Sequence, residues 1–390
     1  MTQIAGLTGH IPSSAAVVRV TAPPYDVIRE GSPLEALLKS EPDNLWHVTL
    51  GPDPLGSLKR LTNGSFKPLD KPHFIVYEQR WQSAKGAQSR IGVFAAVEVS
   101  DYPAGQVIRH EKVFDEKVQG RLKLTKQTGV TLEPVFLLTR SPITPVLHKI
   151  ASSHKPDYDF ISDFKGLNDL DGIASRIFLV PESSPDGQQL QRLVGQNPLY
   201  IADGHHRYHA ALLGGQSHCL AYVVERAAIQ AYNRLVTGVK LFTEIKAQLQ
   251  LTPATWDTPP HREFRIYHKS GCFALKAKTV PTDPRGSLDC AILERELYPV
   301  LGLTHAMIKD PKHFDYYAEW ELAKMKEAVD AGKYDLAIAL HPVSIAELMA
   351  VADAGRSNPD IVMPEKSTFF APKILSGLVL YRHSARAAGR

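Results

Sequence analysis

Leu199-Tyr-Ile-Ala-Asp-Gly-His-His-Arg-Tyr-His-Ala-Ala-Leu212 is the stretch around which the chain is organised. Its first four residues form an apolar run behind a proline, long enough for a buried strand. Asp203 and Gly204 are typical of a turn, and from His205 apolar residues recur at helical spacing until two consecutive glycines. The stretch therefore predicts a strand that passes through a sharp turn directly into a helix.

A helix that begins at such a turn can bind an anion. Its first backbone N–H groups converge on one point, at the positive end of the helix dipole, and such ends bind phosphate. Two histidines and an arginine add side-chain donors, and an arginine can hold a phosphate through two parallel hydrogen bonds. We predict a phosphate-binding site formed by Asp203, Gly204, His205, His206, Arg207 and Tyr208.

Two other interpretations fit the same residues. A strand–turn–helix with Asp203 as N-cap is ordinary architecture, although cations in the first turn cost roughly 0.3–1 kcal/mol each against the helix dipole. His205 and His209 are four residues apart and could bind a metal together with Asp203. No second ligand cluster follows at a recognisable spacing, so we predict no dedicated metal site.

Length and composition set the general class. A chain of 390 residues is too long for one ordinary core. Prolines cluster within residues 240–262, which places a boundary between domains 1–245 and 246–390. Segments with strand and helix patterns follow one another in mixed order, so we predict a mixed α/β fold, with the phosphate site in the first domain and a second α/β domain behind it.

Several classes of protein are disfavoured. A net charge of +4 is small for this length and gives no support for nucleic-acid binding. The N-terminus lacks a signal-peptide pattern, and no run approaches the ~18 apolar residues of a membrane helix. Three cysteines without CxxC spacing are typical of buried thiols in a reducing compartment. We expect a cytoplasmic protein, and a homodimer stays open.

Two other segments carry candidate site residues. The prolines of residues 21–28 would hold Tyr25 and Asp26 in a fixed direction, although the same pattern suits a rigid surface turn. Ionisable residues follow a short strand pattern at residues 107–108, and from Asp115 a helix is predicted. Lys117 and Arg121 lie one turn apart on it and could hold a polyphosphate, or could simply face solvent.

Elsewhere the patterns predict ordinary elements. Phe74–Trp81 and Arg90–Val99 are rich in β-branched and aromatic residues and predict a hairpin. Asn44–Leu50 is predicted to be extended, and Phe314–Ala331 to be an amphipathic helix.

Several motifs together resemble a large prokaryotic family that is classified as a numbered domain of unknown function. They are Ala22-Pro-Pro-Tyr-Asp-Val-Ile28, Tyr77-Glu-Gln79, His110-Glu111-Lys112, Ile201-Ala-Asp-Gly-His-His-Arg-Tyr208 and Lys366-Ser-Thr-Phe-Phe370. The central turn is also similar to the phosphate-binding turn of the ParB/sulfiredoxin-like superfamily, which includes CTP-binding ParB proteins and a free-serine kinase that uses ADP. The resemblance implies a ParB/sulfiredoxin-like core and a bound nucleotide.

The chain departs from the family pattern at three places. Gly120 stands where an acidic residue is usual, Thr131-Leu-Glu-Pro134 replaces Asn-Leu-Ser-Pro, and Tyr232-Asn-Arg234 replaces Thr-His-Arg. A different substrate or a loss of turnover would follow if these residues contact the substrate. Sulfiredoxin chemistry is disfavoured, because His205 occupies the position of its cysteine.

These observations lead to one functional hypothesis and one alternative. We expect a phosphotransferase that acts on a small hydroxylated metabolite, with ATP, ADP or CTP and Mg²⁺ as cofactors. Lys117 and Arg121 would close over the phosphates, and Asp26 or Glu111, with His110 beside it, would handle the acceptor proton. The alternative is a non-catalytic nucleotide-binding regulator. A DNA-binding role ranks third, because no helix-turn-helix or basic stripe is present.

Overall fold

The computed structural model describes residues 2–383 except 84–85, 103–104, 114 and 168–169. The fold is mixed α/β, as predicted. The chain forms two compact units, one of Met1–Ala227 with Pro372–Arg390 and one of Ala228–Ala371. These bounds differ from domains 1–245 and 246–390 for a physical reason. Strand β14 (Tyr232–Val236) pairs with strands of the second unit, and β21 (Leu380–Arg382) returns to pair with the first.

The first unit is built on a large mixed sheet. In the described residues its order is β6-β11-β8-β12-β5-β4-β10-β9, and β1 pairs with the last part of β5, beyond the residues that pair with β4. The strands are β1 (Ile4–Ala5), β4 (His73–Ser83), β5 (Gly86–Glu98), β6 (Val107–Ile108), β8 (Val135–Thr139), β9 (Tyr158–Ile161), β10 (Ala174–Pro181), β11 (Leu199–Asp203) and β12 (His218–Val224). The antiparallel pair β4–β5 confirms the predicted hairpin.

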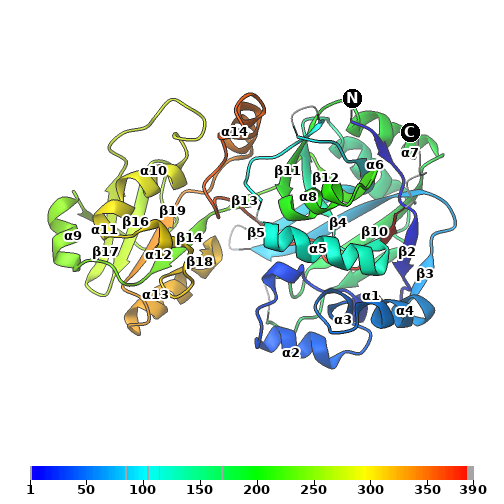
Figure 1. Cartoon of the computed structure of the whole chain (residues 1–390), viewed down its shortest axis with the longest axis horizontal. Coiled ribbons are helices and arrows are strands. Elements are labelled where there is room, and N and C mark those ends of the chain that lie inside the picture. Colours follow the sequence, from blue (N-terminus) through cyan, green and yellow to red (C-terminus); the bar gives the residue numbers. More distant parts are fainter. Residues whose placement is uncertain (1, 84–85, 103–104, 114, 168–169, 384–390) are drawn as a thin grey trace. The chain divides into compact units, whose positions relative to one another are not determined.

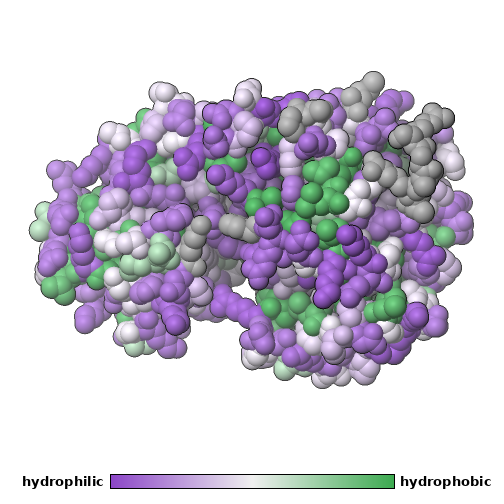
Figure 2. All heavy atoms as spheres, in the orientation of Figure 1, coloured by the Kyte–Doolittle hydropathy of each residue, from purple (hydrophilic) through white to green (hydrophobic). Residues whose placement is uncertain are grey.

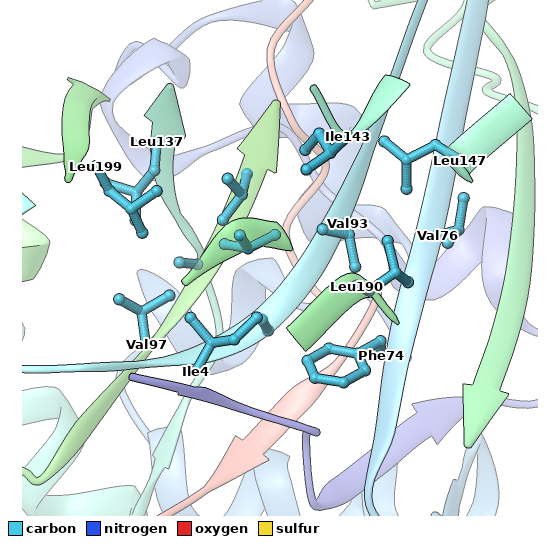
Figure 3. Packing of buried hydrophobic residues seen from close by; sticks show 14 of the residues in the cluster. Ile4, Phe74, Val76, Val93, Val97, Leu137, Ile143, Leu147, Leu190 and Leu199 are labelled. Atoms are coloured by element: carbon cyan, nitrogen blue, oxygen red, sulfur yellow. The ribbon is translucent and has the colours of Figure 1, made fainter. Parts of the chain in front are cut away.

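One face of this sheet forms the main core of the unit. Figure 3 shows Phe74, Val76 and Val93 of β4 and β5 beside Leu147 and Leu190, which come from helices α6 (Thr144–Ser153) and α7 (Pro185–Val194). All five side chains are buried. The alternation of apolar residues along the strands explains this packing, since successive side chains point to opposite faces.

Smaller elements complete the first unit. They are α1 (Val17–Val20), the 3₁₀ turn η1 (Tyr25–Val27), α2 (Pro33–Ser40), α3 (Trp46–Thr49), α4 (Pro54–Gly64), α5 (Asp115–Thr128), α8 (His205–Leu213), and the small sheet of β2 (Gly9–Pro12), β3 (Phe66–Pro68), β7 (Val130–Thr131) and β21. The predicted extended segment Asn44–Leu50 is wrong, because α3 lies there. The Asn44 side chain accepts the Trp46 N–H and donates to the carbonyls of Arg19 in α1 and of Thr21 directly after it, which fixes a helical turn.

The second unit has its own sheet, in the order β15-β17-β16-β19-β14-β18. Its described elements are β13 (Ile229–Gln230), β14, α9 (Phe242–Gln248), β15 (Thr252–Pro253), β16 (Glu263–His268), β17 (Gly271–Lys276), α10 (Asp289–Glu296), α11 (Tyr298–Leu301), α12 (His305–Lys309), β18 (Phe314–Ala318), η2 (Glu319–Glu321), α13 (Leu322–Asp330), β19 (Leu336–Leu340), α14 (Ile345–Ser357) and β20 (Phe369–Phe370). The helix predicted over Phe314–Ala331 is wrong in its first part, because β18 pairs with β14 as a strand, and helical structure begins only with the 3₁₀ turn η2 and α13.

The order of three strands positions the candidate site. β11 lies between β6, to which it is parallel, and β8, to which it is antiparallel. The chain that leaves β6 and the chain that enters β8 therefore meet at the end of β11, where α8 begins. Figure 1 shows α8 beside α5, against which it packs.

Two further observations concern the polarity of the surface and the length of the helices. Hydrophilic residues cover most of the visible face of each unit, with small apolar patches between them (Figure 2). Within the described residues, none of the helices is long and apolar enough to cross a membrane.

Candidate functional site

The predicted strand–turn–helix is present, and Gly204 is its turning point. Gly204 has φ +95° and is the N-cap residue of α8, so Asp203 is not the N-cap, contrary to one interpretation of the sequence. A Cβ atom at Gly204 would lie 2.9 Å from Nε of Arg207. The glycine is therefore required twice, for the left-handed backbone and for the close approach of the guanidinium.

The carboxylate of Asp203 is used by two cations instead of by the helix. Its Oδ2 accepts a hydrogen bond from Lys373 Nζ at 2.5 Å, and its Oδ1 accepts one from Arg207 Nη2 at 3.1 Å. Arg207 Nη1 also donates to the carbonyl of Pro134, just before β8. Burial alone would raise the pKa of Asp203, but Lys373 and Arg207 hold that pKa below its usual range.

A second carboxylate lies on the same side of the turn. Glu133 is buried, accepts the Tyr25 N–H at 3.1 Å and the Ser376 hydroxyl at 3.2 Å, and lies 4.0 Å from Arg121 Nη1. Burial raises the pKa of Glu133 although Arg207 and Arg121 act against the shift. The Arg121 guanidinium stacks 3.8 Å from the centre of the Tyr25 ring. We call Arg121, Glu133, Asp203, Arg207 and Lys373 the cationic flank.

The cationic flank holds more positive than negative charge. Arg121, Arg207 and Lys373 are three cations, whereas Asp203 and Glu133 are two carboxylates. The exposed Asp26 is a third carboxylate within electrostatic reach of Arg207, but burial disfavours the charged form of Glu133, so one positive charge is left over. The side chains of the three cations are only 10–16% exposed. Because unbalanced charge is costly where water is largely excluded, such a cluster favours an anionic ligand.

A small cavity adjoins this flank. It is lined by Arg121, Glu133 and Arg207 together with apolar residues of α5 and α8, and its volume is about 40 Å³. That space suits a few water molecules and is far below the size of typical ligand pockets. The cavity is too small to hold a nucleotide.

Neutral and acidic groups gather on the other side of Gly204. His110 and Glu111 follow β6, and His205 begins α8. His205 Nδ1 lies 3.4 Å from Glu111 Oε2, and the His110 and His205 rings meet edge to face with centroids 4.5 Å apart. Both histidines are buried, with 2% and 3% exposure, while Glu111 is half-buried. We call these three residues the histidine flank.

The histidines of this flank are neutral near pH 7. Burial lowers the pKa of His110 to about 4, and burial with the neighbouring His110 lowers the pKa of His205 well below its usual value. His110 makes a hydrogen bond to the backbone of Ile201, and its Nδ1 has no hydrogen-bond partner. A buried imidazole nitrogen without a partner calls for an explanation.

The other predicted residues have different environments. Lys117 is exposed on α5, and Asp26 is exposed in η1, within electrostatic reach of Arg207 and Glu133. His206 is half-buried in the first turn of α8. Tyr208 is buried in the core, and its hydroxyl bonds the backbone of Ser100, so we leave it out of the proposed site.

One alternative interpretation of the sequence is not supported at this site, and two of its residues were not expected there. In the described residues, the group able to hold a metal is His110, Glu111 and His205, so the pairing of His205 with His209 and Asp203 is wrong. Sequence reasoning did not connect Glu133 or Lys373 with the turn. The signal for Glu133 in the sequence is weak, since it is only a charged residue directly before a proline and a buried strand. Lys373 has no local signal that links it to Asp203, because the two are 170 residues apart.

Comparison with known proteins gives a family and several distant neighbours. A family model described as "Protein of unknown function (DUF1015)" matches residues 7–291. No functionally curated protein matches the sequence. Among solved structures, a free serine kinase in complex with AMP is 13% identical with a TM-score of 0.37, and the match covers 74% of this chain and 92% of that chain.

Two further structures are similarly distant. SbnI with a C-terminal truncation, from Staphylococcus aureus, is 12% identical with a TM-score of 0.39, and the match covers 74% of this chain and 87% of that one. A conserved hypothetical protein from Pyrococcus furiosus is 13% identical with a TM-score of 0.36, over 74% and 95% of the two chains. At these scores the likeness carries no argument about function.

Proposed function

The chain belongs to the DUF1015 family of proteins of unknown function, and from the geometry of its central turn we propose that it binds a nucleotide through its phosphates and transfers a phosphoryl group to a small hydroxylated metabolite. The observation that carries this proposal is the surplus of positive charge on the cationic flank, next to the N-terminus of α8. Phosphoryl transfer depends mainly on positioning and charge neutralisation, which such a flank supplies.

Arg207 would be the main phosphate ligand. Its described hydrogen bonds use two of its three nitrogens, those to Pro134 and Asp203. A phosphate could approach the remaining donors and the first N–H groups of α8, while Asp203 keeps the guanidinium oriented. Lys373 and Arg121 would add charge from the two sides, and Lys117 is exposed one turn before Arg121.

Two carboxylates remain candidates for the acceptor proton. Glu111 lies 3.4 Å from His205 and is half-buried, so it could accept a proton from a hydroxyl bound at the histidine flank. Asp26 is exposed near the cationic flank and is the alternative. One of these carboxylates would help to hold the Mg²⁺ carried with a nucleotide, since carboxylates are suitable hard oxygen ligands, and the ion would supply charge neutralisation for the phosphates.

Calorimetry with ATP, ADP and CTP tests the binding step. Arg207→Ala should weaken binding by about 1.5–3 kcal/mol, because a charged hydrogen bond is lost. Arg19→Ala is the control, since Arg19 is an exposed arginine paired with Asp43 away from the turn. Equal affinity in wild type and Arg207→Ala would end the proposal.

Turnover is tested separately. The protein is incubated with each nucleotide and a panel of small hydroxylated metabolites, and phosphorylated products are sought by mass spectrometry. Glu111→Gln and Asp26→Asn should spare nucleotide binding, and one of them should abolish product formation. Binding without any product would favour the nucleotide-binding regulator instead.

A further inference from the structure

We propose that His110, Glu111 and His205 bind a divalent transition-metal ion, of which Zn²⁺ and Mn²⁺ are the best suited. One ring nitrogen of each histidine and one carboxylate oxygen of Glu111 all lie within 4.8 Å of one another. Ligands in a tetrahedral shell with bonds of ~2.1 Å are roughly 3.4 Å apart, so a modest contraction would close the group around an ion.

The hydrogen bonds of His110 support a role as a ligand. One ring nitrogen bonds the backbone of Ile201, and the other, Nδ1, has no hydrogen-bond partner although the residue is 2% exposed. A metal-binding histidine typically uses one nitrogen for the ion and fixes its ring by a hydrogen bond from the other nitrogen to a carbonyl. A bound ion would thus satisfy a buried nitrogen that otherwise has no partner.

The topology explains why these residues meet. His110 and Glu111 follow β6 and His205 follows β11, and the two strands are parallel neighbours, with Val107 opposite Leu199 and Ile108 opposite Tyr200. Both segments therefore leave the sheet at the same edge. The ligands come from regular elements that the core fixes, which is the usual basis of a defined metal site.

The ligand chemistry selects the kind of ion. Mg²⁺ and Ca²⁺ prefer oxygen ligands, whereas two imidazoles and one carboxylate suit Zn²⁺, Mn²⁺ or Fe²⁺. Three protein ligands leave at least one position open, as in catalytic rather than structural zinc sites. That position would take a phosphate oxygen or an acceptor hydroxyl, and with Glu111 bound to the ion, Asp26 would be the carboxylate left to accept the proton. This role rests on the proposed function, but metal binding itself does not.

The test uses the full chain after chelator treatment and dialysis. Cobalt(II) is added as a spectroscopic probe, and zinc and manganese are then measured by mass spectrometry of the dialysed protein. We expect one ion per chain, visible as cobalt absorption in the ligand-field region. His110→Ala and Glu111→Gln should each weaken binding at least tenfold.

His209→Ala is the matched control. His209 is one turn along α8 from His205 and also has a buried nitrogen without a partner, but it lies outside the ligand group. The His209→Ala variant should bind the ion with wild-type affinity. Loss of the ion in His209→Ala, or its retention in both His110→Ala and Glu111→Gln, would overturn the assignment.

Two further variants keep the outcome clear. Circular dichroism shows whether His110→Ala is folded, and if it is not, the half-buried Glu111 decides the matter through Glu111→Gln. Arg207→Ala should lose nucleotide binding and keep the metal. Metal binding without nucleotide binding in the wild-type protein would therefore refute the proposed function and leave this inference intact. Nucleotide binding without metal binding would refute this inference and leave the proposed function intact.

Discussion

On one side of Gly204 three largely buried cations share two carboxylates within the chain, whereas on the other side the buried groups are neutral. Asp203 joins Arg207, four residues further along the chain, and Lys373, which only folding brings near it from 170 residues away. The histidine flank contains two neutral imidazoles and one half-buried carboxylate. The difference teaches that neighbouring residues of one turn can have different roles, with some stabilising the fold and others binding a ligand. Removing a charge partner should damage folding, and removing a histidine-flank residue should damage binding.

The largest expected effect is on the paired side. Asp203→Asn would leave Lys373 and Arg207 without their shared carboxylate in a site that is largely closed to water, so it should lower the free energy of unfolding by about 3–5 kcal/mol. Urea unfolding followed by circular dichroism measures this. Asp26→Asn, at an exposed position, should change the free energy of unfolding by less than about 0.5 kcal/mol. Similar values for the two variants would show that the ion pairs of Asp203 do not stabilise the fold.

A substitution at the turning point should have the next largest effect. Gly204→Ala forces a side chain into the left-handed region at φ +95° and places its Cβ against the Arg207 guanidinium. We expect a loss of about 2 kcal/mol in the free energy of unfolding, of which roughly 1–2 kcal/mol is backbone strain.

Gly120→Ala provides the matched control for this substitution. Gly120 lies within α5, and a Cβ there would meet nothing within 4 Å. Alanine should therefore stabilise the protein by about 0.5–1 kcal/mol, through its better helix propensity. A neutral or stabilising Gly204→Ala would show that the turn does not need its present backbone.

On the neutral side, the effect on stability should be small. Glu111→Gln keeps the shape of the side chain and removes a charge that is partly in contact with water, so the free energy of unfolding should change by less than about 1 kcal/mol. The same variant should lose metal binding. Thermal unfolding with and without added zinc measures both. A large loss of stability without any loss of the ion would show that the flank is structural.

The sequence predicted the local elements better than the site. The turn at Gly204, the hairpin of β4 and β5 and the bounds of α5 follow from local spacing and turn residues. It could not predict that β6 lies parallel to β11, or that Lys373 reaches Asp203, because both depend on contacts between distant parts of the chain.

Local patterns also failed where tertiary contacts decide the structure. Phe314–Ala318 has an amphipathic helical pattern, yet it pairs with β14 as a strand. The Asn44 side chain fixes a helical turn in the residues that follow it, because it donates to the Arg19 carbonyl of α1 and accepts the Trp46 N–H. The residues of the histidine flank were predicted as site residues, but their meeting as one group was not, because the spacing of His205 and His209 is local and the group that forms joins two strand ends.

The smallest expected effect tests the charge balance of the cationic flank. Burial raises the pKa of Glu133 in the folded state, so between the unfolded and folded pKa values the folded protein binds more protons. The stability that protonated Glu133 contributes is therefore present below about pH 4.5, the ordinary value for a glutamate, and is lost as the pH rises through the folded pKa. Glu133→Gln removes this dependence. The free energy of unfolding of wild type, relative to Glu133→Gln, should thus fall with rising pH in urea titrations. If it rises instead, Glu133 is charged and stabilised by Arg121 and Arg207, and the positive surplus that favours a phosphate is smaller by one charge.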